Sequence, residues 1–255
     1  MIFDLRAAAA ALALLAFSAP GLADPVYPAA AEKVSYAALD SLPDWRGIWL
    51  PKGTPFLSGG EKPRLKGKYL DIYNKTVAGI KIGKAPEARA SNCLPPGMPL
   101  VMMQPYDIEF LFTPGRVTII QEAYMQVRRV FTDGRPLPDD PDPTFNGTSI
   151  GHWEGDTLVI KTVGINEETL MGRFGVTHGP KLTITERIHL KQGDKDTLVD
   201  ELTFDDPDAL EAPWTQSYEY TRNREFNQLE FICAENDRNP ISTSGHTEFE
   251  DVESK

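Results

Sequence analysis

The second half of the chain consists of short runs rich in β-branched and aromatic residues, and turn residues separate these runs at close intervals. Turns that contain glycine fall at 113–115, 133–134, 154–156 and 192–194. Closely spaced strands without intervening helices predict an antiparallel meander. About eight or nine strands are enough to close a barrel that holds one small ligand. The predicted strands are 44–50, 106–112, 116–131, 148–154, 157–163, 181–190, 197–204, 214–222 and 226–233.

The pattern before these strands predicts one helix and no second domain. Leu65, Tyr69, Tyr73 and Ile80 recur at near-helical spacing, which predicts a helix over about 63–80. The proline-rich stretch 91–99 predicts a rigid connector without helix. We therefore expect a single mainly β domain over 44–236, preceded by a leader with little structure at 24–43 and followed by a flexible tail at 237–255.

The N-terminus has the layout of a secretory signal peptide. An apolar run at 7–17 follows Arg6, and Gly21 and Ala23 have the small side chains that precede a cleavage site after residue 23. The alternative is a membrane anchor, but this run is too short to span a hydrocarbon core of about 30 Å. We expect a periplasmic or secreted protein that is not inserted in a membrane after cleavage of residues 1–23.

The two cysteines, Cys93 and Cys233, fit this compartment. In an exported protein a single pair most simply forms one disulfide, which here would join the start of the folded core to its last strand. The alternative is a reactive thiol, although neither cysteine lies in a Cys-x-x-Cys pattern.

Charge and motifs exclude several classes of function. The net charge of −11 argues against binding of nucleic acid and against adhesion to anionic membranes. The chain has neither a glycine-rich nucleotide motif nor the histidine spacing of common zinc sites, so we expect no cofactor and no metal. Met98, Met102 and Met103 allow two interpretations, copper ligands or apolar residues that fill gaps, and the second is the commoner one.

Strand alternation places charged side chains among apolar ones. Glu186 shares a face with Ile184 and Ile188, and Asp200 shares a face with Leu198 and Leu202. If 116–131 is one strand, Arg129 also points inward, although a one-residue bulge would exchange it with Arg128. Because buried charges need partners or water, these residues predict either a polar lumen or a buried ion pair that holds the sheet together.

His178 lies in a loop just before the strand of Glu186, where an imidazole can reach a ligand at the mouth of the barrel. Histidine titrates near neutral pH, which suits a general acid or base. The predicted catalytic residues are therefore His178, Glu186 as its partner, and Arg129 as the group that holds an anionic oxygen. The alternative is a loop histidine that hydrogen-bonds a backbone carbonyl.

Aromatic and polar side chains on the same strands are candidates for binding an apolar or flat ligand. Each of the aromatic ones, taken singly, is more simply a core residue. The predicted substrate-binding residues are Tyr124, Asp200, Trp214, Tyr218 and Tyr220.

Several motifs in this order resemble a widespread family of exported proteins of environmental bacteria. The motifs, which span about 44–236, are Cys-Leu-Pro-Pro-Gly-Met-Pro at 93–99, Asp-Gly-Arg-Pro at 133–136, Trp-Glu-Gly-Asp-Thr-Leu-Val at 153–159, His178 before Thr-Glu-Arg at 185–187, Asp-Asp-Pro at 205–207, Pro-Trp at 213–214 and Cys-Ala-Glu-Asn at 233–236. The resemblance implies that His178, Glu186, Arg187 and 133–135 are motif positions, and it implies no reaction. The chain departs from the family at 171–173, where an acidic residue is expected.

Gly47, Ile48 and Trp49 also resemble the Gly-x-Trp signature of lipocalin-like barrels. We therefore expect an antiparallel meander that closes into a lipocalin-like barrel with one N-terminal helix.

The expected function is that of a cofactor-independent enzyme, a lyase, isomerase or hydrolase that acts on a small organic molecule in the barrel. A periplasmic carrier without catalysis and an envelope scaffold with a packed interior are the alternatives. Substrate and oligomeric state stay open.

Overall fold

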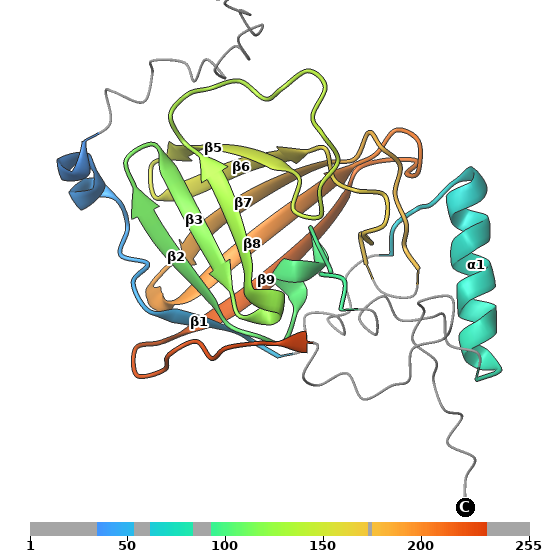
Figure 1. The fold of residues 1–255 in the computed structure, drawn as a ribbon, viewed down its shortest axis with the longest axis horizontal. Coiled ribbons are helices and arrows are strands. Elements are labelled where there is room, and N and C mark those ends of the chain that lie inside the picture. The colour runs from blue at the N-terminus through green and yellow to red at the C-terminus, as the bar shows by residue number, and fades with distance from the viewer. Residues whose placement is uncertain (1–34, 54–61, 84–92, 173–174, 234–255) are drawn as a thin grey trace, which may run out of the picture.

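The computed structural model describes residues 35–53, 62–83, 93–172 and 175–233, and nine strands of this part close into a barrel (Figure 1). The strands follow one another around the barrel in chain order, and β9 pairs with β1. Their bounds are β1 (Ile48–Pro51), β2 (Ile108–Thr113), β3 (Arg116–Gln121), β4 (Gln126–Phe131), β5 (Thr148–Glu154), β6 (Thr157–Val163), β7 (Thr183–Lys191), β8 (Asp194–Asp205) and β9 (Trp214–Asn223). The barrel predicted from the sequence is confirmed, and it is lipocalin-like in shape.

Glycine turns make the hairpins, as predicted, at three of the four expected places. Gly115, Gly155 and Gly193 all have positive φ angles, which a glycine adopts without steric cost. The turn at 133–134 is different, because it opens the long loop 132–147 instead of joining two neighbouring strands. This loop carries the chain back along the barrel, so β4 and β5 are the one parallel pair and share only two register positions.

The predicted strand 116–131 is two strands with a sharp turn between them. The 3₁₀ turn η6 (Ala123–Met125) separates β3 from β4, and Tyr124 and Met125 have φ angles of 57° and 49°. The predicted strand 226–233 is wrong, since the described residues that follow β9, 224–233, have no strand structure. Part of the predicted leader is also ordered, as η2 (Tyr36–Ser41), a 3₁₀ helix.

One end of the barrel is closed by aromatic side chains. Trp45 makes ring contacts with Phe110, Phe112 and Trp153 at centroid distances of 5.2, 5.6 and 5.3 Å. Beside it, the Arg222 guanidinium lies 4.5 Å from the ring centre of Trp49 and donates to the backbone carbonyls of residues 44 and 46. These contacts tie β1 to β9 where the barrel closes on itself.

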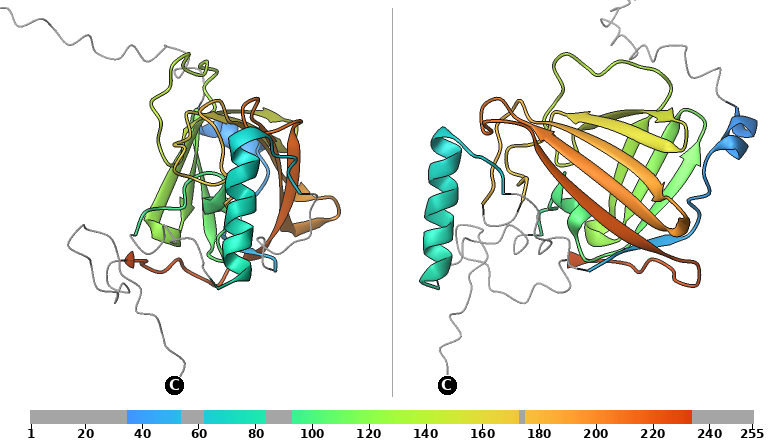
Figure 2. Two further views of the ribbon diagram at one scale, coloured as in Figure 1. Left: turned by 90° about the vertical axis from the view of Figure 1, so that its right-hand side faces the viewer. Right: turned by 180° about the vertical axis from the view of Figure 1, so that it is seen from behind.

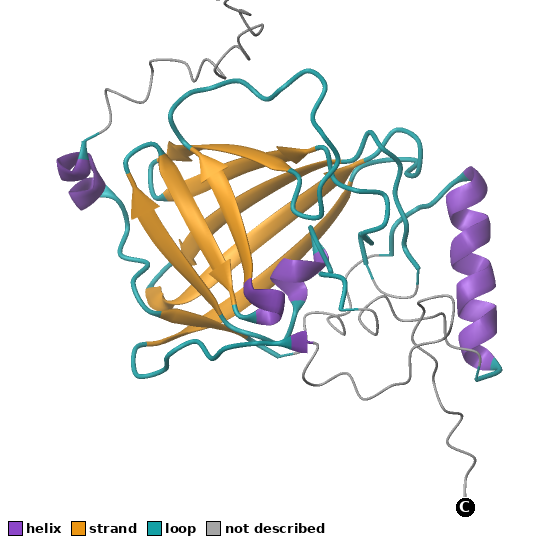
Figure 3. Ribbon diagram, viewed as in Figure 1, coloured by secondary structure: helices purple, strands orange, loops and turns teal. Residues whose placement is uncertain are grey.

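The other end is covered by loops and by helix α1 (Gly67–Lys81), which stands in front of this end in Figure 2. The helix begins four residues later than predicted, and Pro63 precedes it. Tyr69 is its one buried residue. Figure 3 shows the short helical turn η5 (Leu100–Met103), which lies near this end of the strands. A disulfide between Cys93 and Cys233 confirms the predicted pair, although Cys233 follows the last strand instead of lying in it.

Candidate functional site

Six consecutive strands, β4 to β9, each place at least one polar side chain in the interior of the barrel. One such side chain from each strand belongs to a polar layer that lies within the otherwise largely apolar core. We call this layer the polar belt. Its members, from β4 to β9, are Arg128, Ser149, Thr162, Glu186, Asp200 and Tyr218.

Arg128 and Glu186 form a buried ion pair across the belt. The Arg128 side chain is 1% exposed and that of Glu186 is not exposed at all. Arg128 Nη1 donates to Glu186 Oε1 at 2.7 Å, and Nη2 donates to Oε2, which makes the contact bidentate. Because both charges are removed from water, each depends on the other for its stability.

The predicted inward position of Arg129 is wrong, since its side chain is exposed on the outer face of β4. The turn at Tyr124 and Met125 shifts the alternation by one residue, so that Arg128 and Val130 point inward. The predicted inward positions of Glu186 and Asp200 are confirmed, because β7 and β8 are regular at these residues.

Ser149 and Thr162 were not predicted from the sequence, and they complete the coordination of Arg128. Their hydroxyl groups lie 2.9 Å apart, and Arg128 Nη2 lies 2.9 Å from Thr162 Oγ1. A second bond joins Arg128 Nε to Ser149 Oγ at 3.3 Å. One sequence signal could have identified both residues. Each is a polar residue in a β-rich run, at a position where strand alternation points the side chain inward.

Asp200 differs from the rest of the belt. Its side chain is not exposed at all, and neither carboxyl oxygen has a hydrogen-bond partner. Burial, followed by the negative charge of Glu186, holds the pKa of Asp200 well above its usual range. The positive charge of Arg128 only partly offsets this, because Arg128 is bound to Glu186. Burial without a hydrogen-bond partner therefore favours the uncharged carboxylic acid, which can donate a hydrogen bond.

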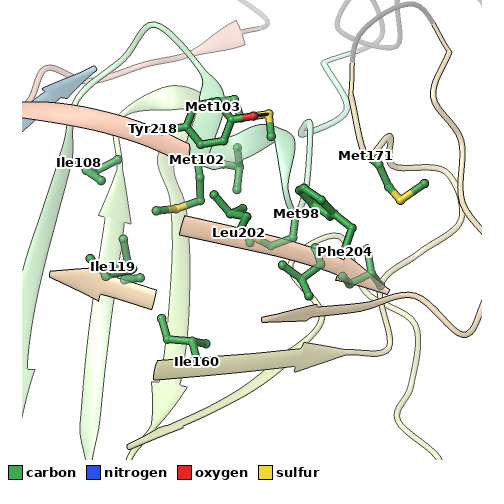
Figure 4. Close-up of a cluster of buried hydrophobic side chains, with 14 of the residues drawn as sticks. Met98, Met102, Met103, Ile108, Ile119, Ile160, Met171, Leu202, Phe204 and Tyr218 are labelled. Carbon is green, nitrogen blue, oxygen red and sulfur yellow. Dashed lines mark hydrogen bonds between the residues drawn. The ribbon is translucent and has the colours of Figure 1, made fainter. Parts of the chain in front are cut away.

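Tyr218 and Tyr220 lie next to Asp200 on β9, and η5 contacts both. Tyr218 is the direct register partner of Asp200, and its hydroxyl donates to Met103 Sδ at 3.4 Å (Figure 4). Tyr220 donates to the backbone carbonyl of Met102 at 2.6 Å. A thioether sulfur is a weak acceptor, whereas a carbonyl is a strong one. The hydrogen bond of Tyr220 thus anchors it to η5. The Tyr218 hydroxyl can instead donate to a stronger acceptor than the Met103 sulfur.

The methionines of the sequence motif fill the covered end of the barrel. Met98, Met102 and Met103 are all buried, and Met102 Sδ accepts a hydrogen bond from Gln121 Nε2 at 2.8 Å. The other amide atom of Gln121, Oε1, has no partner. These contacts favour the interpretation of the methionines as flexible apolar residues that fill gaps in the core next to the polar belt.

His178 is buried in the loop before β7, and its contacts hold that loop together. Its Nδ1 lies 2.8 Å from the carbonyl oxygen of Gly179, which can only accept, so Nδ1 carries the proton. Nε2 then accepts from the hydroxyl of Thr169 at 2.8 Å. Burial lowers the pKa of His178, which keeps the ring neutral.

No contact described for His178 involves Glu186 or Arg128. Glu186 lies three residues inside β7, which places it about 10 Å along the strand from Thr183 at about 3.3 Å per residue. His178 is five residues further away along the chain. The predicted set of His178, Glu186 and Arg129 is therefore not brought together among the described residues.

The remaining predicted binding residues lie outside the belt. Trp214 is half-buried at the start of β9 and stacks on Phe204 at 4.9 Å. Tyr124 lies in η6 and contacts Phe231 in the segment after β9, at 4.9 Å.

Other motif residues make contacts that hold the barrel and its loops. Arg187 donates to Glu154 across the outer face, at 2.9 Å. Asp206 accepts backbone hydrogen bonds from Gly179 and Asp208, at 2.6 and 2.9 Å, and so ties together two loops at the covered end. Met171, at the departure from the motif, is fully buried.

Among the residues that the structure describes, no three His, Cys, Asp or Glu side chains are arranged to hold a metal ion. In the same part of the chain, no helix is long and apolar enough to cross a bilayer. Comparison with models of known protein families and with curated proteins finds no match for this chain.

Proposed function

We propose that this protein binds a small organic molecule inside its barrel, as a lipocalin-like binding or carrier protein. One observation carries the proposal: Asp200 is a fully buried carboxyl group without a hydrogen-bond partner. A buried polar group of this kind costs stability, and such groups cluster at sites that bind other molecules. The surrounding interior is apolar, which suits an organic ligand.

The compartment supports the same proposal. The N-terminal segment 1–23 has the pattern of a signal peptide, and a disulfide joins Cys93 to Cys233. Disulfides persist in oxidising compartments, so we propose that the protein acts in the periplasm or outside the cell.

Native mass spectrometry of freshly purified protein tests the binding role. We expect one small molecule per chain, released unchanged on denaturation. The Asp200→Leu variant should retain less of it, while the variant Asp205→Asn, which changes an exposed residue of the same strand, should retain it fully. A wild-type protein that carries no molecule and takes up none from an extract of its source would contradict the proposal.

A second candidate is acid/base catalysis in the same interior, as a lyase, isomerase or hydrolase. It is favoured by the raised pKa of Asp200, because a raised pKa favours the protonated carboxyl group that a general acid needs. His178 and Arg129 take no part in this version. The identity of the released molecule, from its mass and its chromatographic retention, distinguishes the two functions, since an enzyme releases product and a carrier releases the molecule it took up.

A further inference from the structure

The polar belt contains two hydrogen-bond donors on neighbouring strands whose capacity is not used by strong acceptors. Asp200 on β8 and Tyr218 on β9 are register partners, so their Cβ atoms lie about 5 Å apart on the same face. Both side chains are buried, at 0% and 5% exposure. Both donors therefore belong to one patch of the barrel interior.

The charges around Asp200 decide what it can bind. Glu186 is the negative group that acts most strongly on Asp200, and the Arg128 guanidinium is held by Glu186, Ser149 and Thr162. A second negative charge here would stand buried without a partner, which is far more costly than a neutral acid. Asp200 therefore presents a proton to a ligand, as Tyr218 does, and both groups select an acceptor.

The acceptor must be carried by an apolar molecule. The inward neighbours of Asp200 on β8 are apolar, namely Leu198, Leu202 and Phe204, and Met102 and Met103 of η5 are buried in the same core. Tyr218 now donates to the sulfur of Met103, so an oxygen acceptor in the same place would replace a weak bond by a stronger one. Methionine has the flexibility to move aside without breaking a regular element.

We propose that Asp200 and Tyr218 form a two-donor site that binds the carbonyl oxygen of an apolar ligand beneath the Met102–Met103 turn. This site rests on the proposed binding function and gives it a ligand class, a compound with an apolar body and one carbonyl group.

The experiment compares two fluorescent probes. The first is 6-propionyl-2-dimethylaminonaphthalene, whose emission moves to longer wavelength when its carbonyl accepts a hydrogen bond. The second is 2-dimethylaminonaphthalene, which lacks the carbonyl. We expect the wild-type protein to bind the first about five- to tenfold more tightly, as one or two net hydrogen bonds would give. Its bound emission should show a hydrogen-bonded carbonyl.

Five variants locate the preference. Tyr218→Phe and Asp200→Leu should each lose most of it, and Asp200→Asn, which keeps an N–H donor, should retain it. Asp205→Asn and Tyr36→Phe change exposed residues and should leave it unchanged. If Asp200→Leu does not fold, Tyr218→Phe and the bound emission still decide the question.

The outcomes separate this site from the proposed function. If both probes bind the wild-type protein equally well, the two-donor site is wrong and the binding function stands. If the variants bind both probes as the wild type does, the site is likewise wrong. If 2-naphthylmethylammonium binds more tightly than the carbonyl probe, Asp200 is ionised and selects cations, which also overturns the site. If none of the probes binds, the binding function itself is contradicted, and the site with it.

Discussion

The two halves of the polar belt face the same interior but differ in how many of their polar groups have hydrogen-bond partners. On β4 to β7, Arg128 and Glu186 satisfy each other, and two hydroxyl groups satisfy the rest of the guanidinium. On β8, Asp200 has no partner at all, and on β9 Tyr218 has only a described bond to sulfur. A buried carboxyl group without a hydrogen-bond partner does not stabilise the barrel. The satisfied half is therefore structural, and the other half is the candidate for binding.

The largest effect should come from breaking the satisfied half. Arg128→Met leaves the Glu186 carboxylate buried without its cation, which should lower the free energy of unfolding by about 3–5 kcal/mol. Arg129→Met is the matched control on the outer face and should change it by less than about 0.5 kcal/mol. Urea denaturation measures both. Equal losses in the two variants would contradict the assignment of a special stabilising role to the buried Arg128.

Substitution of Asp200, in the other half of the belt, should raise the free energy of unfolding instead of lowering it. Because the pKa of folded Asp200 lies above its value in the unfolded chain, its neutral form stabilises the fold at low pH, and this is lost as pH rises through the folded pKa. Asp200→Asn cannot ionise and should be more stable than the wild type at alkaline pH, by a margin that shrinks towards pH 4.

The same denaturation series on Glu186→Gln provides the contrast. This change strands the Arg128 cation in the core, so the variant should be less stable than the wild type at every pH. An Asp200→Asn protein that is as damaged as Glu186→Gln would show that Asp200 has a partner on which the fold depends.

A third buried carboxyl group lies outside the belt and tests the same reasoning with a smaller effect. Burial, and then the charge of Glu122, raises the pKa of Asp107 to about 6. The protein should lose stability as pH rises from about 4 to 7, on the order of 1–3 kcal/mol from this group. Asp107→Asn should reduce the slope by this amount and leave the part that Asp200 contributes. Thermal denaturation across this range measures it, and an unchanged slope would assign the pH dependence elsewhere.

The smallest effects separate the two tyrosines beneath η5. Tyr220→Phe leaves a buried carbonyl without its donor and should cost about 1–2 kcal/mol. Tyr218→Phe loses only a bond to sulfur and should cost less than about 0.5 kcal/mol in the absence of ligand. A larger loss for Tyr218→Phe than for Tyr220→Phe would place Tyr218 with the structural half of the belt.

Strand positions and hairpins were predictable because they depend on local patterns. Gly155 and Gly193 mark turns through their own backbone freedom, and alternation alone places Glu186 and Asp200 inside. The break within 116–131 was not recognised, although a strand of that length far exceeds the usual five or six residues. Two residues with positive φ there exchanged Arg129 for Arg128.

Local sequence thus determined that this chain forms a closed β-barrel with carboxyl groups facing inward, because side-chain periodicity and turn chemistry act over a few residues. Which charges meet was decided by the tertiary structure. Arg128 and Glu186 are 58 residues apart, and their contact requires β4 to β7 to stand side by side in one register. The same closure left Asp200 without a cation, since the one arginine beside it was already engaged. Pairing between distant strands is a property of the whole barrel, and no short stretch of sequence encodes it.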